Sequence, residues 1–100
     1  MRTVIETPTF KKQADAIWSE EERLELISWL AEHPDAGTLI PGGDGARKLR
    51  WHASGRGKRG GARIIYFIPD HDTLWLIAAY TKNRKENLPA HTIREMKDGH

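Results

Sequence analysis

The sequence predicts an α+β protein with the element order β-α-α-β-β-β-α, in which an antiparallel sheet carries two N-terminal helices on one face. Three observations lead to this fold class. Two helical patterns follow a short β-branched segment, three strand-like segments then follow one another, and the last segment begins like a short C-terminal helix. Consecutive strands with short connections form an antiparallel meander. We expect a single domain over residues 1–100, the size at which one modest core is usual.

The expected first strand and both N-terminal helices lie in the first third of the chain. Residues 2–7 alternate and contain β-branched residues, which is typical of a short strand. Residues 8–18 form the first helix and bring apolar side chains to one side. Ser19 and Glu22 form a capping-box pattern for the second helix, which Pro34 ends. The apolar stripe expected on this helix comprises Leu24, Ile27, Leu30 and Ala31, widened by Leu26 and Trp29.

The remaining strands follow a segment rich in turn residues at 34–45. Residues 46–53 alternate, with Leu49 and Trp51 on one face and Lys48, Arg50 and His52 on the other. Residues 62–68 form the most strand-like segment, and residues 73–80 have the near-continuous apolar character of a central strand covered on both faces. A turn at 69–72 joins these two strands, and a polar connection at 81–87 leads to the last helix.

Charge is distributed unevenly along the chain. Residues 1–44 contain four Lys/Arg against nine Asp/Glu, whereas residues 45–100 contain twelve against five. The segment GRGKRGGAR at 55–63 has four glycines and four cations, and no acid occurs between Asp44 and Asp70. Such a pattern points to an anionic partner, most often nucleic acid, and the alternative is a flexible, solvated hairpin. The glycines allow positive φ and a close approach of the backbone to a ligand.

Further cations lie on the strands that flank this segment. Antiparallel neighbours bring the strand ends together, so these residues should form one phosphate-binding cluster. Cleavage of RNA through the 2′-hydroxyl requires removal and return of a proton and stabilisation of charge on phosphorus. Arginines could stabilise the charge on phosphorus. A lysine, Tyr80 or His52 could remove the proton or return it. For His52 we favour an edge histidine without a role, and for Tyr66 and Trp51 we favour core packing over base stacking.

Other kinds of site are not supported. The absence of cysteine excludes disulfides, thiol catalysis and a cysteine-based zinc site. His71 and Asp72 lack a third ligand at a recognisable spacing, and residues 42–45 lack the lysine of a phosphate-binding P-loop. We therefore expect neither a metal nor a small-molecule cofactor. No signal or membrane-spanning segment is recognisable, so we expect a cytoplasmic protein without a membrane partner.

In order, the segments GARKLRW, GRGKRGGARIIYF and LIAAYTKNRKENL resemble the HigB-type toxins of the RelE/ParE superfamily of type II toxin–antitoxin systems. The resemblance covers residues 3–95 and is most specific over 45–88. It implies a RelE-like fold and a metal-independent endoribonuclease that cleaves mRNA in the A site of the 70S ribosome and so inhibits translation. The implied partners are the ribosome with its mRNA and a cognate antitoxin, a helix-turn-helix protein of HigA type.

The resemblance also implies roles for individual residues. Arg63 matches the strand arginine that stabilises charge in the transition state, Lys48 and Arg50 match the basic pair on the preceding strand, and Lys82 matches the basic position after the last strand. Asn83 stands where RelE has an arginine, with Arg84 one step later, and Pro89 stands where RelE has a tyrosine. The general acid and base stay open, with Tyr80 as a substitute or a structural residue.

The resulting candidates form two groups. The catalytic candidates are Lys48, Arg50, Arg63, Tyr80 and Lys82. The RNA-binding candidates are Arg47, Arg56, Lys58, Arg59, Asn83 and Arg84. Two alternatives use the same fold or the same charges: a ParE-like toxin that acts on DNA gyrase, and a non-catalytic module that only binds nucleic acid.

Overall fold

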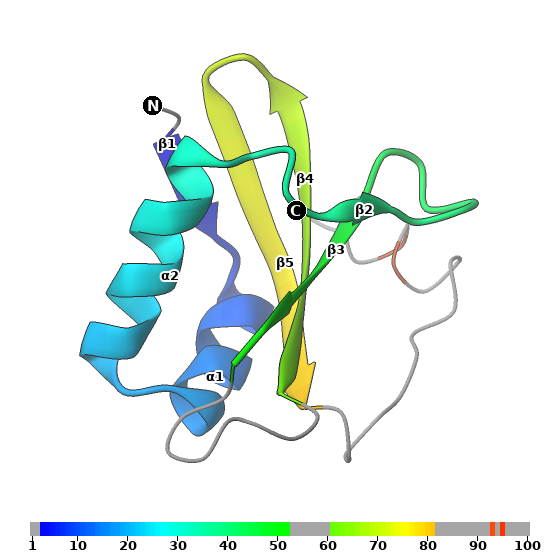
Figure 1. Ribbon diagram of the computed structural model, residues 1–100. Helices are drawn as coiled ribbons and strands as arrows, with labels where there is room; N and C mark the ends of the chain where they lie inside the picture. Colours follow the sequence, from blue (N-terminus) through cyan, green and yellow to red (C-terminus); the bar gives the residue numbers. More distant parts are fainter. Residues whose placement is uncertain (1–2, 53–60, 82–92, 94, 96–100) are drawn as a thin grey trace.

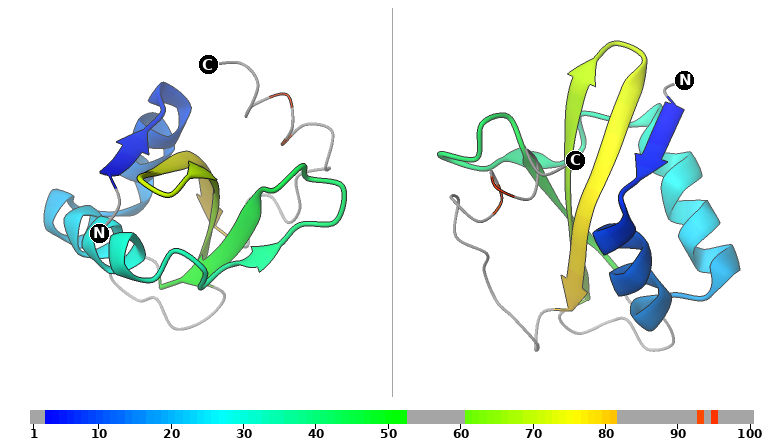
Figure 2. Two further views of the ribbon diagram at one scale, coloured as in Figure 1. Left: turned by 90° about the horizontal axis from the view of Figure 1, so that it is seen from above. Right: turned by 180° about the vertical axis from the view of Figure 1, so that it is seen from behind.

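The computed structural model describes residues 3–52, 61–81, 93 and 95. Within them, five strands form one sheet in the order β1-β5-β4-β3-β2, and two helices pack on one of its faces (Figures 1 and 2). The elements are β1 Thr3–Glu6, α1 Pro8–Ile17, α2 Glu20–Glu32, β2 Thr38–Leu39, β3 Arg47–Trp51, β4 Ala62–Asp70 and β5 Thr73–Thr81. The predicted α+β class is confirmed, and the predicted strands and N-terminal helices occur in the expected order, with β2 in addition. None of the helices among the described residues is long and apolar enough to cross a membrane.

Both helices begin at a capping residue, of which Ser19 was predicted. The Thr7 hydroxyl accepts a hydrogen bond from the Phe10 amide, and a proline occupies the first turn of α1. At the start of α2, the Ser19 hydroxyl accepts from the Glu22 amide at 3.2 Å, and the Glu22 carboxylate accepts from the Ser19 amide at 2.8 Å. The predicted capping box is therefore formed. The stripe predicted on α2 is partly wrong, because Leu24 is exposed whereas Leu26, Leu30 and Ala31 are buried.

The sheet differs from the expected antiparallel meander at both of its edges. β1 pairs with β5 in parallel, so the sheet is mixed. β2 is an additional two-residue strand that pairs antiparallel with the start of β3, inside the segment expected to contain only turns. β3, β4 and β5 form the expected antiparallel meander. The amino-acid pattern of a strand does not specify its neighbour or its direction, so only the folded chain decides these edges.

The two faces of the sheet carry two different apolar clusters. The helix-covered face packs against Phe10, Ala14, Trp18, Leu26 and Leu30. The opposite face carries Ala46, Ile65, Ile77, Ala78 and Tyr80, on which Ile93 packs. An extra residue in β5 near Ile77 shifts the register with β4, and it places Ile77 and Ala78 together in the second cluster. β5 is thus buried on both faces, as predicted. Of the predicted C-terminal helix, only Ile93 and Glu95 lie within the described residues, and both have helical backbone.

Helix α1 covers the edge of β5 beyond the point where β1 ends. The pairing of β1 with β5 stops at Leu76. From there, the Thr7 hydroxyl contacts the carbonyl oxygens of Leu76 and Ile77 at 2.9 and 3.3 Å, and the Gln13 side-chain oxygen accepts from the Ala79 amide at 2.8 Å. These contacts satisfy backbone groups that would otherwise lie at an open sheet edge. They also hold the end of β5 that carries Tyr80.

Candidate nucleic-acid interface

Three candidate residues form a row across the sheet on the face opposite the helices. Arg50 on β3 is the register partner of Arg63 on β4, and Arg63 is the register partner of Tyr80 on β5. Register partners project to the same face of a sheet. The neighbouring partners Leu49 and Ile64 belong to the helix-covered cluster, so the row projects away from the helices. The sequence predicted that these strand ends lie together, and the register shows which residues are partners.

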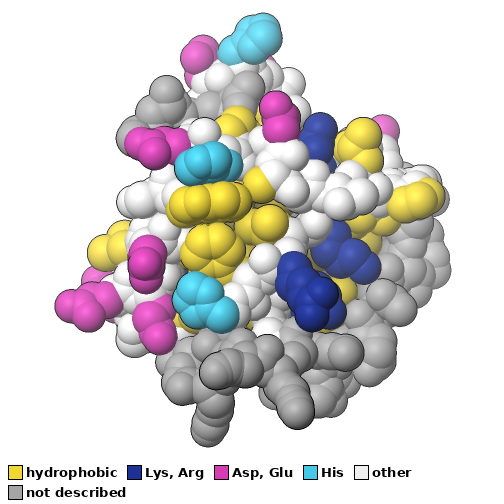
Figure 3. Space-filling view, viewed as in Figure 1, with side chains coloured by type: hydrophobic (Ala, Val, Ile, Leu, Met, Phe, Trp, Pro, Cys, Tyr) yellow, Lys and Arg dark blue, Asp and Glu magenta, His cyan; other side chains and the backbone are white. Residues whose placement is uncertain are grey.

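Lys48 extends this row along β3. It lies two residues before Arg50 and pairs with Ile65, so it projects to the same face. Arg50 is exposed, whereas Lys48 and Arg63 are half-buried. We call Lys48, Arg50, Arg63 and Tyr80 the cationic sheet face. In Figure 3, Lys and Arg side chains gather near the middle of the view, and most Asp and Glu side chains lie farther toward the helices.

Tyr80 is mainly a buried packing residue of the cationic sheet face. Its side chain is only 9% exposed and belongs to the cluster that includes Ile77 and Ile93. A phenol packed in this way offers little ring surface to a nucleobase. It lies instead beside Arg63, near the end of β5. The position suits a fixed neighbour of Arg63 better than a stacking platform.

Gly61 sets the start of β4. Its φ is +58°, and a Cβ atom at this position would lie 2.7 Å from the Trp51 carbonyl oxygen. Only glycine meets both conditions without strain. The predicted positive φ is therefore confirmed at this glycine, but the close approach is to the protein's own strand β3. The result is a tight base for the β3–β4 pairing, two residues before Arg63.

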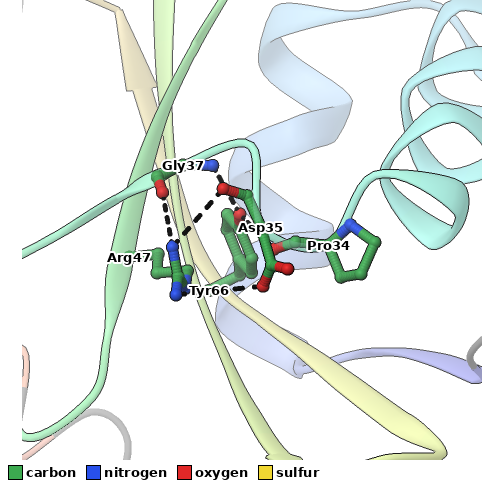
Figure 4. Close-up of polar contacts among 5 residues, drawn as sticks. All are labelled: Pro34, Asp35, Gly37, Arg47 and Tyr66. Atoms are coloured by element: carbon green, nitrogen blue, oxygen red, sulfur yellow. Dashed lines mark hydrogen bonds and ion pairs between the residues drawn. The ribbon is translucent and has the colours of Figure 1, made fainter.

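Arg47 lies apart from the other candidates. Because side chains alternate along β3, Arg47 projects to the face opposite Lys48. Its guanidinium donates to the Gly37 carbonyl oxygen at 2.7 Å and lies 3.9 Å from the Asp35 carboxylate (Figure 4). Arg47 therefore lies on the other face of β3 from Lys48 and Arg50, and its hydrogen bond ties the turn after α2 to β3.

Tyr66 completes this tie from β4. Its hydroxyl donates to the Pro34 carbonyl oxygen at 2.7 Å and accepts from the Gly37 amide at 2.8 Å (Figure 4). The side chain is fully buried, which confirms its predicted use in the core. Burial raises the pKa of the Tyr66 phenol above its usual value, while the Gly37 amide and the Arg47 charge oppose this shift. These contacts hold α2 to the strands that carry the cationic sheet face.

The other candidates lie outside the described residues. They are Arg56, Lys58, Arg59, Lys82, Asn83 and Arg84. The strand ends next to them are described: Trp51 pairs with Ala62, and Ala62 pairs with Thr81. Within the described ranges, no group of three or more His, Asp and Glu side chains lies close enough together to hold a metal ion.

A feature that the sequence did not reveal is a series of ring contacts between α2 and β3, in which two stacked pairs are joined by a tilted one. His33 stacks on Trp29, with ring centroids 4.3 Å apart, Trp29 meets Trp51 at 5.1 Å, and Trp51 stacks on His52 at 5.1 Å. We call these four side chains the ring ladder. The spacing of Trp29 and His33 on one helix predicts their contact. The contact between Trp29 and Trp51 depends on how α2 packs against β3, which no spacing gives.

Comparison with known proteins supports the fold. No family model matches the sequence. A solved structure of the Escherichia coli toxin RelE, a variant with two arginines replaced by alanine and in the free state, has a TM-score of 0.65 to this protein. The match covers 97% of each chain at 14% sequence identity. The chain therefore has a RelE-like α+β fold.

Proposed function

We propose that this protein is the toxin of a type II toxin–antitoxin pair, of HigB type, and that it cleaves mRNA in the A site of the ribosome. The observation that carries the proposal is the row of Arg50, Arg63 and Tyr80 across three adjacent strands, extended by Lys48. Cations gathered on one face of a sheet supply the charge that binds the phosphates of a nucleic acid. The RelE-like fold is consistent with this proposal.

In the proposed reaction, the 2′-oxygen of the RNA forms a bond to the adjacent phosphorus, and the bond from phosphorus to the 5′-oxygen breaks. A base takes the 2′-hydroxyl proton, and an acid protonates the leaving 5′-oxygen. The products are a 2′,3′-cyclic phosphate and a 5′-hydroxyl end. Among the predicted catalytic residues, Lys48, Lys82 and Tyr80 are the ones whose side chains can give up or accept a proton. The arginines keep their charge and do not transfer protons.

Arg63 is the residue that we expect to stabilise the additional negative charge on phosphorus. It lies on β4 with a paired strand on each side, and its side chain is half-buried. Its backbone is therefore fixed, and a fixed charge stabilises a transition state without reorganisation. Arg50 is exposed at the same register position, and we expect it to hold an adjacent phosphate.

The proposed partners follow from the same surface. The ribosome presents the mRNA as a polyanion, and the cationic sheet face provides the complementary charge. We expect a cognate antitoxin, a helix-turn-helix protein of HigA type, to prevent cleavage either by covering this face or by blocking entry to the ribosome by its bulk.

The test is brief expression in bacteria followed by mapping of mRNA 5′ ends. We expect cuts in phase with codons, in translated messages only, and their loss in Arg63→Ala. The matched control is Lys12→Ala, which removes an exposed cation from α1 and should leave cleavage unchanged. Intact mRNA with arrested replication would instead indicate a ParE-like toxin acting on gyrase. Binding of RNA without any cut would indicate a non-catalytic module.

A further inference from the structure

The ring ladder presents an imidazole at each end. His33 and His52 are exposed, whereas Trp29 and Trp51 are half-buried between them. The ladder brings together one helix and one strand, and Figure 3 shows a column of apolar side chains with a histidine at each end. Each terminal imidazole stacks on a tryptophan, and the two tryptophans meet at an interplanar angle of 48°. Because His33 and His52 are both exposed, each end of the ladder offers ring surface to a further planar group.

Both terminal residues are tied to the fold by hydrogen bonds as well as by stacking. The His52 carbonyl oxygen accepts from the Trp18 indole nitrogen at 2.9 Å. The His33 Nδ1 atom lies 2.8 Å from the Trp29 carbonyl oxygen. Rings that are fixed before a ligand arrives lose less conformational entropy on binding than flexible ones. Each end of the ladder is thus a preorganised stacking surface.

The charges around the two ends differ. Next to His33 in the chain is Glu32, and Asp35 follows two residues later. Next to His52 the nearest charged residue in the described chain is Arg50, which is exposed. In Figure 3, dark-blue cations lie beside the ring column, and most acidic side chains lie on its other side. Arg47 lies 3.9 Å from the Asp35 carboxylate and offsets part of the acidic charge near His33, so a ligand that carries phosphate is attracted more strongly at the His52 end.

The edge of β3 next to His52 is open. β2 pairs with β3 only at Arg47 and Lys48, so the segment from Leu49 to Trp51 has no further strand beside it among the described residues. Trp51 belongs to the helix side of β3 and Arg50 to the cationic sheet face. A single strand of RNA that crosses this edge can place a phosphate at Arg50 while a base lies over His52.

We infer that His52 is a stacking platform for a nucleobase of single-stranded RNA, at the border of the cationic sheet face. This inference rests on the proposed function, because it names a contact to the proposed substrate. Histidine is among the side chains on which unstacked RNA bases pack. His52 acts here as a positioning residue, and the role needs a flat ring rather than a transferable proton. The structure therefore favours a role for a residue that the sequence indicated to be without one.

The experiment measures binding of the full chain to two polyanions at fixed salt: a short oligoadenylate and inorganic polyphosphate of matched charge. For His52→Ala we expect about tenfold weaker binding of oligoadenylate, the effect of one lost base stack, and unchanged binding of polyphosphate. His52→Phe should retain binding of oligoadenylate, since it keeps a flat ring. The matched control His33→Ala removes the other terminal ring and should leave both affinities unchanged.

Several outcomes would overturn the inference. They are equal binding of oligoadenylate by His52→Ala and the wild type, equal losses in His52→Ala and His33→Ala, or a loss in His52→Phe as large as that in His52→Ala. Unfolding midpoints in urea confirm that each variant is folded. Binding is measured without the ribosome and without cleavage. Stacking at His52 in a protein that cuts no mRNA would therefore leave this inference intact and refute the proposed function. Cleavage of mRNA by a protein whose His52→Ala variant binds oligoadenylate as the wild type does would do the opposite.

Discussion

Arg50 and Arg63 lie directly opposite one another on β3 and β4. Like charges in this position destabilise a sheet by about 0.2–1 kcal/mol. We therefore expect Arg50→Gln to raise the free energy of unfolding by roughly 0.5 kcal/mol while weakening the binding of RNA. Urea unfolding at low salt measures the gain, which should shrink in about 1 M salt because the repulsion is screened. A variant that is less stable than the wild type would show that the two charges are not in conflict.

Arg50 and Arg63 should affect different kinetic constants. With Arg63→Ala we expect single-turnover cleavage to fall about 10²- to 10³-fold with a smaller change in binding, as for loss of a transition-state contact. With Arg50→Ala we expect weaker binding and a salt dependence of log K reduced by about 0.7, the value for one lost phosphate contact on a single strand. Ribosomes programmed with a defined mRNA allow both the single-turnover cleavage rate and the binding affinity to be measured. Equal effects of the two changes on chemistry would contradict this division.

Arg47→Ala should lower the stability of the protein without weakening RNA binding, whereas Arg50→Ala should weaken RNA binding. Its guanidinium donates to the Gly37 carbonyl oxygen on the face opposite Lys48, so its loss removes a hydrogen bond of the fold. We expect the free energy of unfolding to fall by about 1 kcal/mol and the affinity for RNA to stay unchanged at temperatures where the variant is folded. Paired measurements of urea midpoint and RNA affinity test this. A loss of affinity without a loss of stability would return Arg47 to the binding surface.

Tyr66→Phe should destabilise the protein by about 2 kcal/mol near neutral pH, because the buried Gly37 amide loses its acceptor. The raised pKa of Tyr66 adds a dependence on pH. Above about pH 10, the unfolded chain releases the phenol proton while the folded protein keeps it, so stability falls as the pH rises. We expect the difference between wild type and Tyr66→Phe to narrow in this range. Urea unfolding at pH 7 to 11 measures it, and a constant difference would contradict the assignment.

Gly61→Ala should damage the site as well as the fold. The positive φ and the contact with the Trp51 carbonyl oxygen together predict a loss of at least about 1 kcal/mol and a shift at the start of β4. The control is Gly45→Ala, which also has a positive φ, of +92°, but would meet nothing within 4 Å. We expect both variants to lose stability, and only Gly61→Ala to lose cleavage beyond what its unfolded fraction explains.

The sequence alone predicted the features that depend on local chemistry. The capping box of Ser19 and Glu22, the proline at the start of α1 and the doubly buried β5 all follow from residue types at short spacing. Alternation along β3 was enough to place Lys48 and Arg50 on one face and Leu49 on the other. Short-range patterns of this kind survive folding because the same backbone geometry produces them in any protein.

The tertiary structure decided the features that depend on which segments meet. These features are the parallel pairing of β1 with β5, the hydrogen bond from Arg47 to Gly37 and the contact of Trp29 with Trp51, and each joins two different elements or segments. No periodicity encodes such partners, because each results from the packing of complete elements around a shared core. The same packing set the register that aligns Arg50, Arg63 and Tyr80 in one row, and it stacked the imidazole of His52 on Trp51.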